Sequence, residues 1–474
     1  MKKFLLLLTT ALYFISATAQ ISEADINFAK QLVTKNQAAI ALSAEDQQNF
    51  LVTSTYKTAE GLQMVYLQQT YLGIPVYNQL QVLAFRNEKL VSNAGGRIPD
   101  IHKSVNGKNG MPAVSVVEAL QTALLDAKAT ALEAAVPINI SSDGHKFEFG
   151  KLGATSENIK ADLLWYPIEG KNEVKLVWQV FVTPKVSSDY LLIRVDANTN
   201  AVVDRTNLTI TCNWNHDGHS VEAHVKENHA AAISNNSYVV QQPAKKWQVR
   251  PDVISSVTYR VVKYPAESPT HPGGVPSLHT DPWLMAGAPA ASLGWHDDGT
   301  TLHDSTRGNN VWAQEDRDAN NTTFGRTALS TTPQPTLTLD YTYDFTKAPT
   351  DATSDNQKAA ITNLFYWNNI IHDIAYVYGF DEPTGNFQNN NQGRGGLGND
   401  YVIADAQDAS GTNNANFSTP VDGNRPRMQM FLWTAPNPDR DGDLDNSIVV
   451  HEYTHGISNR YTGGPATASC LGNA

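Results

Sequence analysis

The residues best suited to chemistry are two histidines and a glutamate close to the end of the chain, His451, Glu452 and His455. In a helix, residues four apart share a face, so both imidazoles can reach one metal ion, and Glu452 lies close to that face. Two imidazoles suit Zn²⁺, which lowers the pKa of a bound water to about 7. Glu452 can hold that water and accept its proton. The motif therefore predicts hydrolysis by zinc-activated water, with two histidine ligands and a glutamate general base.

The zinc coordination that this motif provides is incomplete. A catalytic zinc usually has three protein ligands and one open position, but no Asp or Glu follows Glu452 before Ala474. We therefore expect the chain as given to bind zinc weakly and to have little or no peptidase activity. A carboxylate from elsewhere, such as Asp441 or Glu382, or one from a partner chain, is the alternative source of the third ligand.

The flanking sequence predicts the helix that positions these residues. A mostly apolar, β-branched run at 447–450 leads into His451, and Gly-Gly-Pro at 463–465 provides a stop. The sequence around the motif therefore favours a buried, metal-binding helix over the alternative of a helix that carries two surface histidines.

Alternating aspartates precede this helix: Asp439, Asp441, Asp443 and Asp445. They are similar to the start of a calcium loop, but Leu444 and Val450 stand where an EF-hand needs glycine and glutamate. We interpret the segment as a turn that caps the helix. A second candidate pair, His372 and Asp373, is interpreted as structural, because adjacent residues of a helix do not face the same way.

The N-terminus has the features of a secretory signal peptide at 1–19. Lys2 and Lys3 form its charged region, residues 4–15 its apolar region, and Ala-Thr-Ala at 17–19 its cleavage site. No other stretch is apolar enough to cross a membrane. We therefore expect a secreted, extracellular protein without a membrane partner.

Charge and cysteine content limit the possible partners. The chain has 35 basic and 47 acidic residues, a net charge of −12, which argues against binding to nucleic acid. The two cysteines, Cys212 and Cys470, could form one disulfide, although we place them in different domains. Cys212 as a latch on the zinc is a further alternative.

Patterns along the chain divide it into several segments. Residues 20–112 combine a helical segment with alternating strands, and 113–205 open with a helix at Ser115 and continue as strands. Residues 206–256 are polar and irregular, as expected of a linker or processing region. Residues 257–474 contain short strands, a strong helix candidate at 355–379 and the metal-binding helix at their end.

Much of this sequence closely resembles the fungalysin metallopeptidases, secreted relatives of thermolysin. The resemblance rests on ordered runs in the C-terminal half: 294–297, 306–311, 363–368, 371–373, 379–382, 385–388, 413–417, 422–423, 428–430, 440–443 and 451–465. Residues 50–98, around the run 68–76, resemble the propeptide that fungalysins and thermolysins share. Residues 113–205 are similar to the inhibitory propeptide module that commonly follows it.

The resemblance implies an α+β precursor of a zinc endopeptidase. In that family a glutamate on a later helix is the third zinc ligand, so we expect this chain to be the truncated or incomplete product of a longer gene. Propeptide modules of curled antiparallel sheet and helices would precede the β-rich N-terminal lobe of a thermolysin-like peptidase, which ends in the metal-binding helix. His451 and His455 would bind Zn²⁺, and Glu452 would be the general base. Asn414 and Ala415 would belong to an edge strand that binds the backbone of protein or peptide substrates.

The family relationship also implies a contact between the propeptide and the catalytic domain within one chain. The alternative function is a non-catalytic fragment, whose propeptide modules bind or inhibit a peptidase domain. For the enzyme, we expect the N-terminus of the mature form near Val257, after a cut within residues 206–256.

Overall fold

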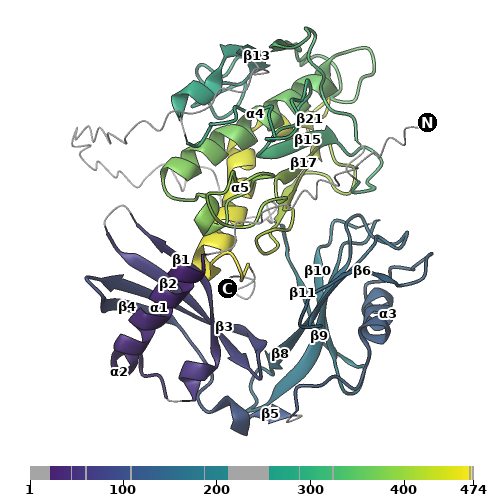
Figure 1. Ribbon diagram of the computed structural model, residues 1–474. Coiled ribbons are helices and arrows are strands. Elements are labelled where there is room, and N and C mark those ends of the chain that lie inside the picture. The colour runs from purple at the N-terminus through teal and green to yellow at the C-terminus, as the bar shows by residue number, and fades with distance from the viewer. Residues whose placement is uncertain are drawn as a thin grey trace, which may run out of the picture.

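The computed structural model describes residues 22–471, except 44, 59–60, 107–108, 186, 212–255, 288, 323–324 and 469–470. The predicted signal peptide and both cysteines lie outside the described residues. Figure 1 shows three parts: two sheet-containing bodies side by side, and a third body that lies across them.

The first part is a four-stranded antiparallel sheet with a helix on one face. Its elements are α1 (Glu23–Lys35), α2 (Gln37–Ile40), β1 (Phe50–Lys57), β2 (Gln63–Tyr71), β3 (Ile74–Arg86) and β4 (Lys89–Gly95). The Ser22 side chain caps α1 by accepting a hydrogen bond from the backbone N–H of Asp25. Leu32 and Val33 of α1 pack against Val65 and Leu83 of the sheet. The predicted helix and strands of this region are confirmed.

The second part repeats the combination of one helix and an antiparallel sheet. Its elements are β5 (Val105–Asn106), α3 (Val116–Asp126), β6 (Pro137–Ile140), β7 (Lys146–Phe149), β8 (Lys160–Pro167), β9 (Val174–Val182), β10 (Leu191–Asp196) and β11 (Val202–Asn207). Ser115 and Glu118 form a capping box at the start of α3, where the helix was predicted to begin. A single parallel pair, Val76 with Trp165, joins β3 to β8 and makes the two sheets continuous.

The third part contains two mixed sheets and two long helices. One sheet has the order β12 (Thr209–Thr211), β18 (Ala415–Ser418), β19 (Arg427–Met430), β17 (Val402–Ala406) and β15 (Val311–Glu315). The other has the order β14 (Ser277–Thr280), β13 (Ser256–Val261) and β16 (Thr336–Leu339), and β20 (Leu432–Trp433) pairs with β21 (Arg440–Asp441). The helices are α4 (Asn356–Val377) and α5 (Asn446–Gly463). The fold is therefore mixed α+β, as expected.

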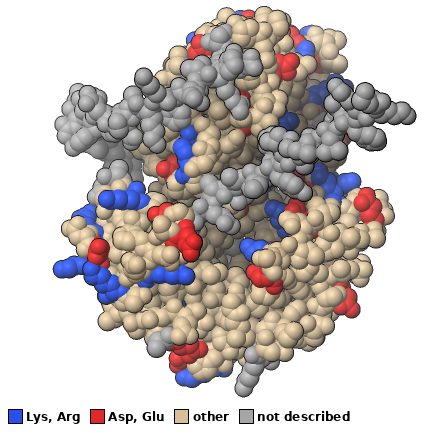
Figure 2. Space-filling view, in the orientation of Figure 1, with Lys and Arg blue, Asp and Glu red and all other residues tan. Residues whose placement is uncertain are grey.

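Short 3₁₀ helices complete the described elements: η1 (Asp46–Gln48), η2 (Ile101–Lys103), η4 (Pro282–Met285), η5 (Glu382–Thr384) and η6 (Gly442–Leu444). No helix in the described ranges has the length and hydropathy needed to cross a membrane. On the face shown in Figure 2, the described acidic and basic residues are interspersed.

Helix α4 is the centre of the third part and lies where the 355–379 pattern predicted it. It packs on β15, β17, β13 and α5, and its apolar side chains belong to one core with those strands. The buried Asn363 donates hydrogen bonds to the carbonyl of Asp443 (2.7 Å) and to the Asn446 side chain (2.9 Å). These bonds fix the start of α5 against α4.

Candidate metal centre

Helix α5 carries the candidate metal-binding residues, and the acidic segment before it acts as a cap. Asp445 accepts hydrogen bonds from the backbone N–H of Ser447 (3.1 Å) and from its hydroxyl (2.5 Å). Asp441 accepts one from the backbone N–H of Asp443 (3.1 Å). The predicted capping turn is confirmed, and this arrangement satisfies backbone donors that a helix start leaves without partners.

His451, Glu452 and His455 come together on α5. Their candidate ligand atoms lie within 4.8 Å of one another. The two imidazole centroids are 4.7 Å apart, with ring planes at 90°. His451 is exposed, His455 is half-buried and Glu452 is fully buried. The helical spacing thus produces the convergence that the sequence predicts.

The protonation states around this group suit a cation. Partial desolvation of its ring lowers the pKa of His451 although the residue is exposed overall, and burial together with the neighbouring His451 lowers that of His455. Both imidazoles are therefore neutral at neutral pH, the form that binds metal. Burial raises the pKa of Glu452 to about 8, and neither of its carboxylate oxygens has a hydrogen-bond partner among the described residues. Two imidazoles beside a buried, partnerless carboxylate fit a divalent metal ion.

The two carboxylates that we considered as a third ligand lie elsewhere. Glu382 forms an ion pair with Arg394 (2.5 Å) and accepts a hydrogen bond from the Tyr376 hydroxyl (2.7 Å). Asp441 accepts a hydrogen bond from the Gln407 side chain (2.6 Å). Among the described residues, only Glu452 joins the two histidines in the metal group. The alternative in which Asp441 or Glu382 supplies the third ligand therefore has no support in this conformation.

An aromatic cluster and a buried arginine hold α5 in place. Tyr453 contacts Phe387 and Phe417, with ring centroids 5.5 and 6.1 Å away. Arg460 is fully buried and donates to a carboxylate oxygen of Asp400 (2.5 Å) and to backbone carbonyls of the surrounding loops, including Asn424 (2.9 Å). Because Arg460 bonds to several loops at once, it fixes the C-terminal half of α5 against the rest of the third part.

Strand β18 lies beside α5 and contains the predicted substrate-binding segment. Ala415 is its first residue and pairs with Met430 of β19. Asn414 directly precedes the strand, and its side-chain oxygen accepts a hydrogen bond from the N–H of Ala415 (2.9 Å). On its other side, β18 pairs antiparallel with β12, with Thr209 opposite Ser418. Residues 209–211, which the sequence pattern placed in a linker, are thus the strand that covers the β18 edge.

His372 and Asp373 do contact each other, although the expectation was that they would face different ways. The Nδ1 atom of His372 lies 2.9 Å from a carboxylate oxygen of Asp373. The other oxygen of Asp373 accepts a hydrogen bond from the Trp295 indole (2.9 Å), and Gln388 Nε2 lies 3.3 Å from His372 Nε2. Adjacent side chains bend toward each other because both are buried. The pair lies within the core, as its structural interpretation requires.

The sequence analysis missed a buried acidic cluster of Asp316, Asp405 and Asp408. Burial, followed by repulsion from the other two carboxylates, raises the pKa of Asp316 to about 8. Burial raises the pKa of Asp405 to about 6, against the opposing effect of Arg427. Strands β15 and β17 are parallel neighbours, so residues at their carboxyl ends meet at one edge. The available signal was acidic residues at or just beyond the carboxyl ends of two strands, with Asp316 after β15, Asp405 near the end of β17 and Asp408 beyond it.

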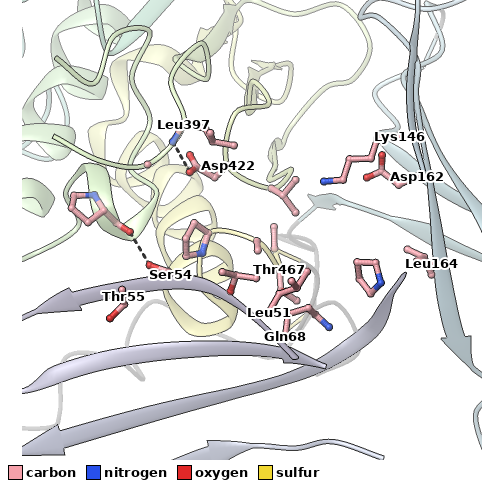
Figure 3. Close-up of a pocket in the computed structure, with 18 of the residues that line it drawn as sticks. Leu51, Ser54, Thr55, Gln68, Lys146, Asp162, Leu164, Leu397, Asp422 and Thr467 are labelled. Carbon is pink, nitrogen blue, oxygen red and sulfur yellow. Dashed lines mark hydrogen bonds between the residues drawn. The ribbon is translucent and has the colours of Figure 1, made fainter. Parts of the chain in front are cut away.

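The cavity shown in Figure 3 lies apart from the metal group. It has a volume of about 890 Å³ where the three parts meet, and its lining includes Thr55, Leu164, Leu397 and Thr467. The Ser54 hydroxyl donates there to a backbone carbonyl of the third part. His451, Glu452 and His455 are not among its lining residues, so this cavity is not the candidate metal centre.

Comparisons with known proteins agree with the geometry of the site. Residues 258–474 match the family described as "Fungalysin metallopeptidase (M36)", and residues 48–98 match the "Fungalysin/Thermolysin Propeptide Motif". One similar protein is "Extracellular metalloproteinase mep" of Aspergillus flavus, 32% identical over 97% of this chain and 64% of its own length. "Extracellular metalloproteinase 9" of Coccidioides posadasii is 32% identical over 89% of this chain and 57% of its own length. "Extracellular metalloproteinase 2" of Arthroderma otae is 44% identical over 50% of this chain and 36% of its own length.

The chain spans less than two thirds of the length of these curated relatives. Among solved structures, the "Bacillus megaterium YpeB C-terminal domain" matches at 12% identity with a TM-score of 0.20, over 40% of this chain and 66% of that one. That similarity is too low to support an argument. The sequence matches instead confirm the predicted relationship: residues 258–474 are related to the fungalysin metallopeptidases, and residues 48–98 to the fungalysin and thermolysin propeptide.

Proposed function

We propose that this chain is the precursor, or part of the precursor, of a secreted zinc metalloendopeptidase that hydrolyses peptide bonds in proteins. The observation that carries the proposal is the convergence of His451, Glu452 and His455 within a region that matches the fungalysin family. The extracellular relatives support secretion. Neutral imidazoles and a carboxylate without a partner are the donor set that zinc hydrolases use.

Each residue of the site has a distinct role in this proposal. His451 and His455 hold Zn²⁺ through their neutral imidazoles. When bound, the ion polarises the scissile carbonyl and makes water acidic enough to react near neutral pH. Glu452 accepts the proton of the attacking water and delivers it to the departing amine.

Asn414 and Ala415 would bind the substrate backbone at the β18 edge. Support comes from β12, an extended segment of the chain that pairs antiparallel with this strand. A substrate peptide can add to the same edge by β-augmentation, with main-chain hydrogen bonds aligning it beside α5. While β12 is in place it covers the edge, so the precursor would be inactive until this segment leaves.

The finer domain organisation belongs to the same proposal. Residues 20–112 and 113–205 would be propeptide modules, 206–256 the region cut during activation, and 257–474 the N-terminal lobe of a two-lobed, thermolysin-like catalytic domain. The repeated helix-and-sheet construction of the first two parts supports this division. Contacts between the second and third parts support a propeptide that binds its own peptidase, for example the hydrogen bond from Asn321 to the Ser187 carbonyl (2.7 Å).

Metal removal tests this proposal. We expect dialysis of the full-length secreted protein against a chelator to abolish casein hydrolysis, and stoichiometric Zn²⁺ to restore it. His455→Ala should lower the zinc content and prevent the restoration, because one of the two imidazole ligands is lost. Hydrolysis that survives chelation, or a His455→Ala protein with normal zinc content and activity, would contradict the proposal.

A non-catalytic, inhibitory fragment is the second candidate function. The β12–β18 pairing and the Asn321–Ser187 bond favour it, because they show how the first two parts could hold a peptidase region. The two candidates differ in turnover. When the longer gene product is loaded with zinc and freed of residues before 257, the first candidate predicts casein hydrolysis and the second predicts none.

A further inference from the structure

Gly456 directly follows the second histidine of the metal group and has no room for a side chain. A Cβ atom added there would lie 2.6 Å from Cε1 of Phe417 and 2.9 Å from the nearest atoms of Phe387. Cβ atoms do not approach other heavy atoms within 3.0 Å. Both neighbours are ring atoms in a close-packed core, so they cannot move aside as the end of a lysine could. The glycine is therefore required for the close approach of these rings to α5.

The two rings and Tyr453 form a closed cluster. The centroid of Phe387 is 6.0 Å from that of Phe417 and 5.5 Å from that of Tyr453, and Phe417 is 6.1 Å from Tyr453. All three side chains are fully buried. Because each ring contacts the other two, a displacement of one requires a displacement of the element that carries it.

Phe387 is the less movable of the two neighbours of Gly456. The adjacent Gln388 donates its backbone N–H to Asp400 (3.1 Å). The guanidinium of Arg460 lies 4.6 Å from the ring centroid of Phe387 and is itself anchored to Asp400. A methyl group at position 456 would consequently displace Phe417, which is also its closer neighbour.

Phe417 connects this cluster to the edge that binds an extended peptide. It lies in β18, and its Cα is paired with that of Ile210 in β12. The side chain of Phe417 lies against Gly456 of α5, and its main chain pairs with β12. A shift of the Phe417 ring therefore becomes a shift of β18 relative to His451 and His455.

We propose that Gly456 is a positioning residue, which sets the separation between β18 and the metal-binding helix and thereby aligns a bound polypeptide with Glu452. This inference rests on the proposed peptidase function and names how its substrate strand is placed. Misplacement of reacting groups by 1 Å can cost roughly 100-fold in rate. The position of the histidines is secured separately, by Asn446 at the start of α5 and Arg460 near its end.

The first test uses amide hydrogen exchange in the intact precursor and needs no catalytic activity. Only one of Ile210 and Thr211 points its N–H toward β18, and Gly456→Ala should speed exchange at that amide about tenfold, because a displaced β18 pairs less well with β12. Exchange within α4 should stay unchanged. Gly456→Ala/Phe417→Leu, which removes the ring that the methyl group would meet, should restore slow exchange. Thr462→Ala, an exposed change on the same helix, is the matched control and should have no effect.

The second test measures zinc content and peptide hydrolysis of the activated full-length protein. Gly456→Ala should keep its zinc but lose at least tenfold in kcat/KM, and the added Phe417→Leu change should recover most of that loss. Unchanged exchange and kcat/KM in Gly456→Ala would overturn the inference, and so would a double variant no better than the single one. Failure of the unmodified protein to hydrolyse any peptide would instead overturn the proposed function, and the exchange result would still decide the role of Gly456.

Discussion

At the scale of single residues, the third part of the molecule keeps several ionisable groups out of water. Among the residues that the structure describes, buried Glu452 has no hydrogen-bond partner, whereas buried Arg460 has several. An unpaired buried carboxylate is costly, and such groups concentrate at functional sites. Burial of Glu452 therefore costs stability, and the proposed role as general base would explain why the carboxylate is placed there.

The acidic cluster of Asp316, Asp405 and Asp408 should make stability depend on pH. In the unfolded chain these carboxyls titrate near 3.9, whereas burial and mutual repulsion raise the pKa of Asp316 to about 8 and burial raises that of Asp405 to about 6. Between about pH 4, where the unfolded carboxyls ionise, and about pH 8, where Asp316 ionises in the folded state, the folded state binds more protons than the unfolded state. The free energy of unfolding therefore falls as pH rises from about 4 to about 8. Urea unfolding at pH 5 and pH 8 measures this difference.

Asp316→Asn supplies the matching comparison. The amide cannot ionise, so this variant should lose less stability between pH 5 and pH 8 than the unmodified protein does. Asp304→Asn, at an exposed position, should show the same difference in the free energy of unfolding between pH 5 and pH 8 as the unmodified protein. A pH profile that is unchanged by Asp316→Asn would show that this carboxyl is not the titrating group.

At the scale of elements, the sequence predicted most helices and strands because their patterns are local. Ser115 marks the start of α3, and the apolar side of 355–379 marks α4. The pairing of β12 with β18 could not be predicted in this way. It joins residues about 200 positions apart, and although the three residues of β12 are β-branched, so short a run does not predict which strand it pairs with.

The β12–β18 pairing should restrain activation of the precursor. In an antiparallel pair, the N–H groups of successive residues point alternately toward and away from the neighbouring strand. We therefore expect proline at Thr209, Ile210 and Thr211, introduced one at a time, to act in alternation. Variants that lose an inward N–H should activate several-fold faster, measured as the time to half-maximal peptide hydrolysis, and the others should activate normally. Equal activation times in all three would contradict a role for this strand.

At the scale of the whole molecule, the first two parts and the peptidase region form one assembly. The strand at 209–211 and the side chains of Ser54 and Asn321 make contacts between them. The family resemblance predicted such an internal contact, but its residues could not be read from the sequence. Side chains such as Asn321 have no special spacing, and only folding brings them to their partners.

The convergence of His451, Glu452 and His455 could be predicted from the sequence, because their spacing needs only one helix. The helix places His451, Glu452 and His455 together whatever the rest of the chain does. By contrast, the packing of Phe387 and Phe417 on Gly456 requires three segments to meet, so the glycine had no interpretation before the fold was known. Residue spacing within one helix is enough to predict which side chains come together, whereas the placement of that helix against β18 depends on tertiary structure.

The central claim is that Glu452 acts as a general base beside a metal held by the two histidines. Glu452→Ala removes the base but leaves both imidazoles, so we predict an unchanged zinc content and a loss of roughly 100- to 10,000-fold in kcat for peptide hydrolysis. The measurement is zinc content and turnover of the same activated, full-length preparation, with Thr462→Ala as the control on the same helix. Near-normal turnover in Glu452→Ala would contradict the account.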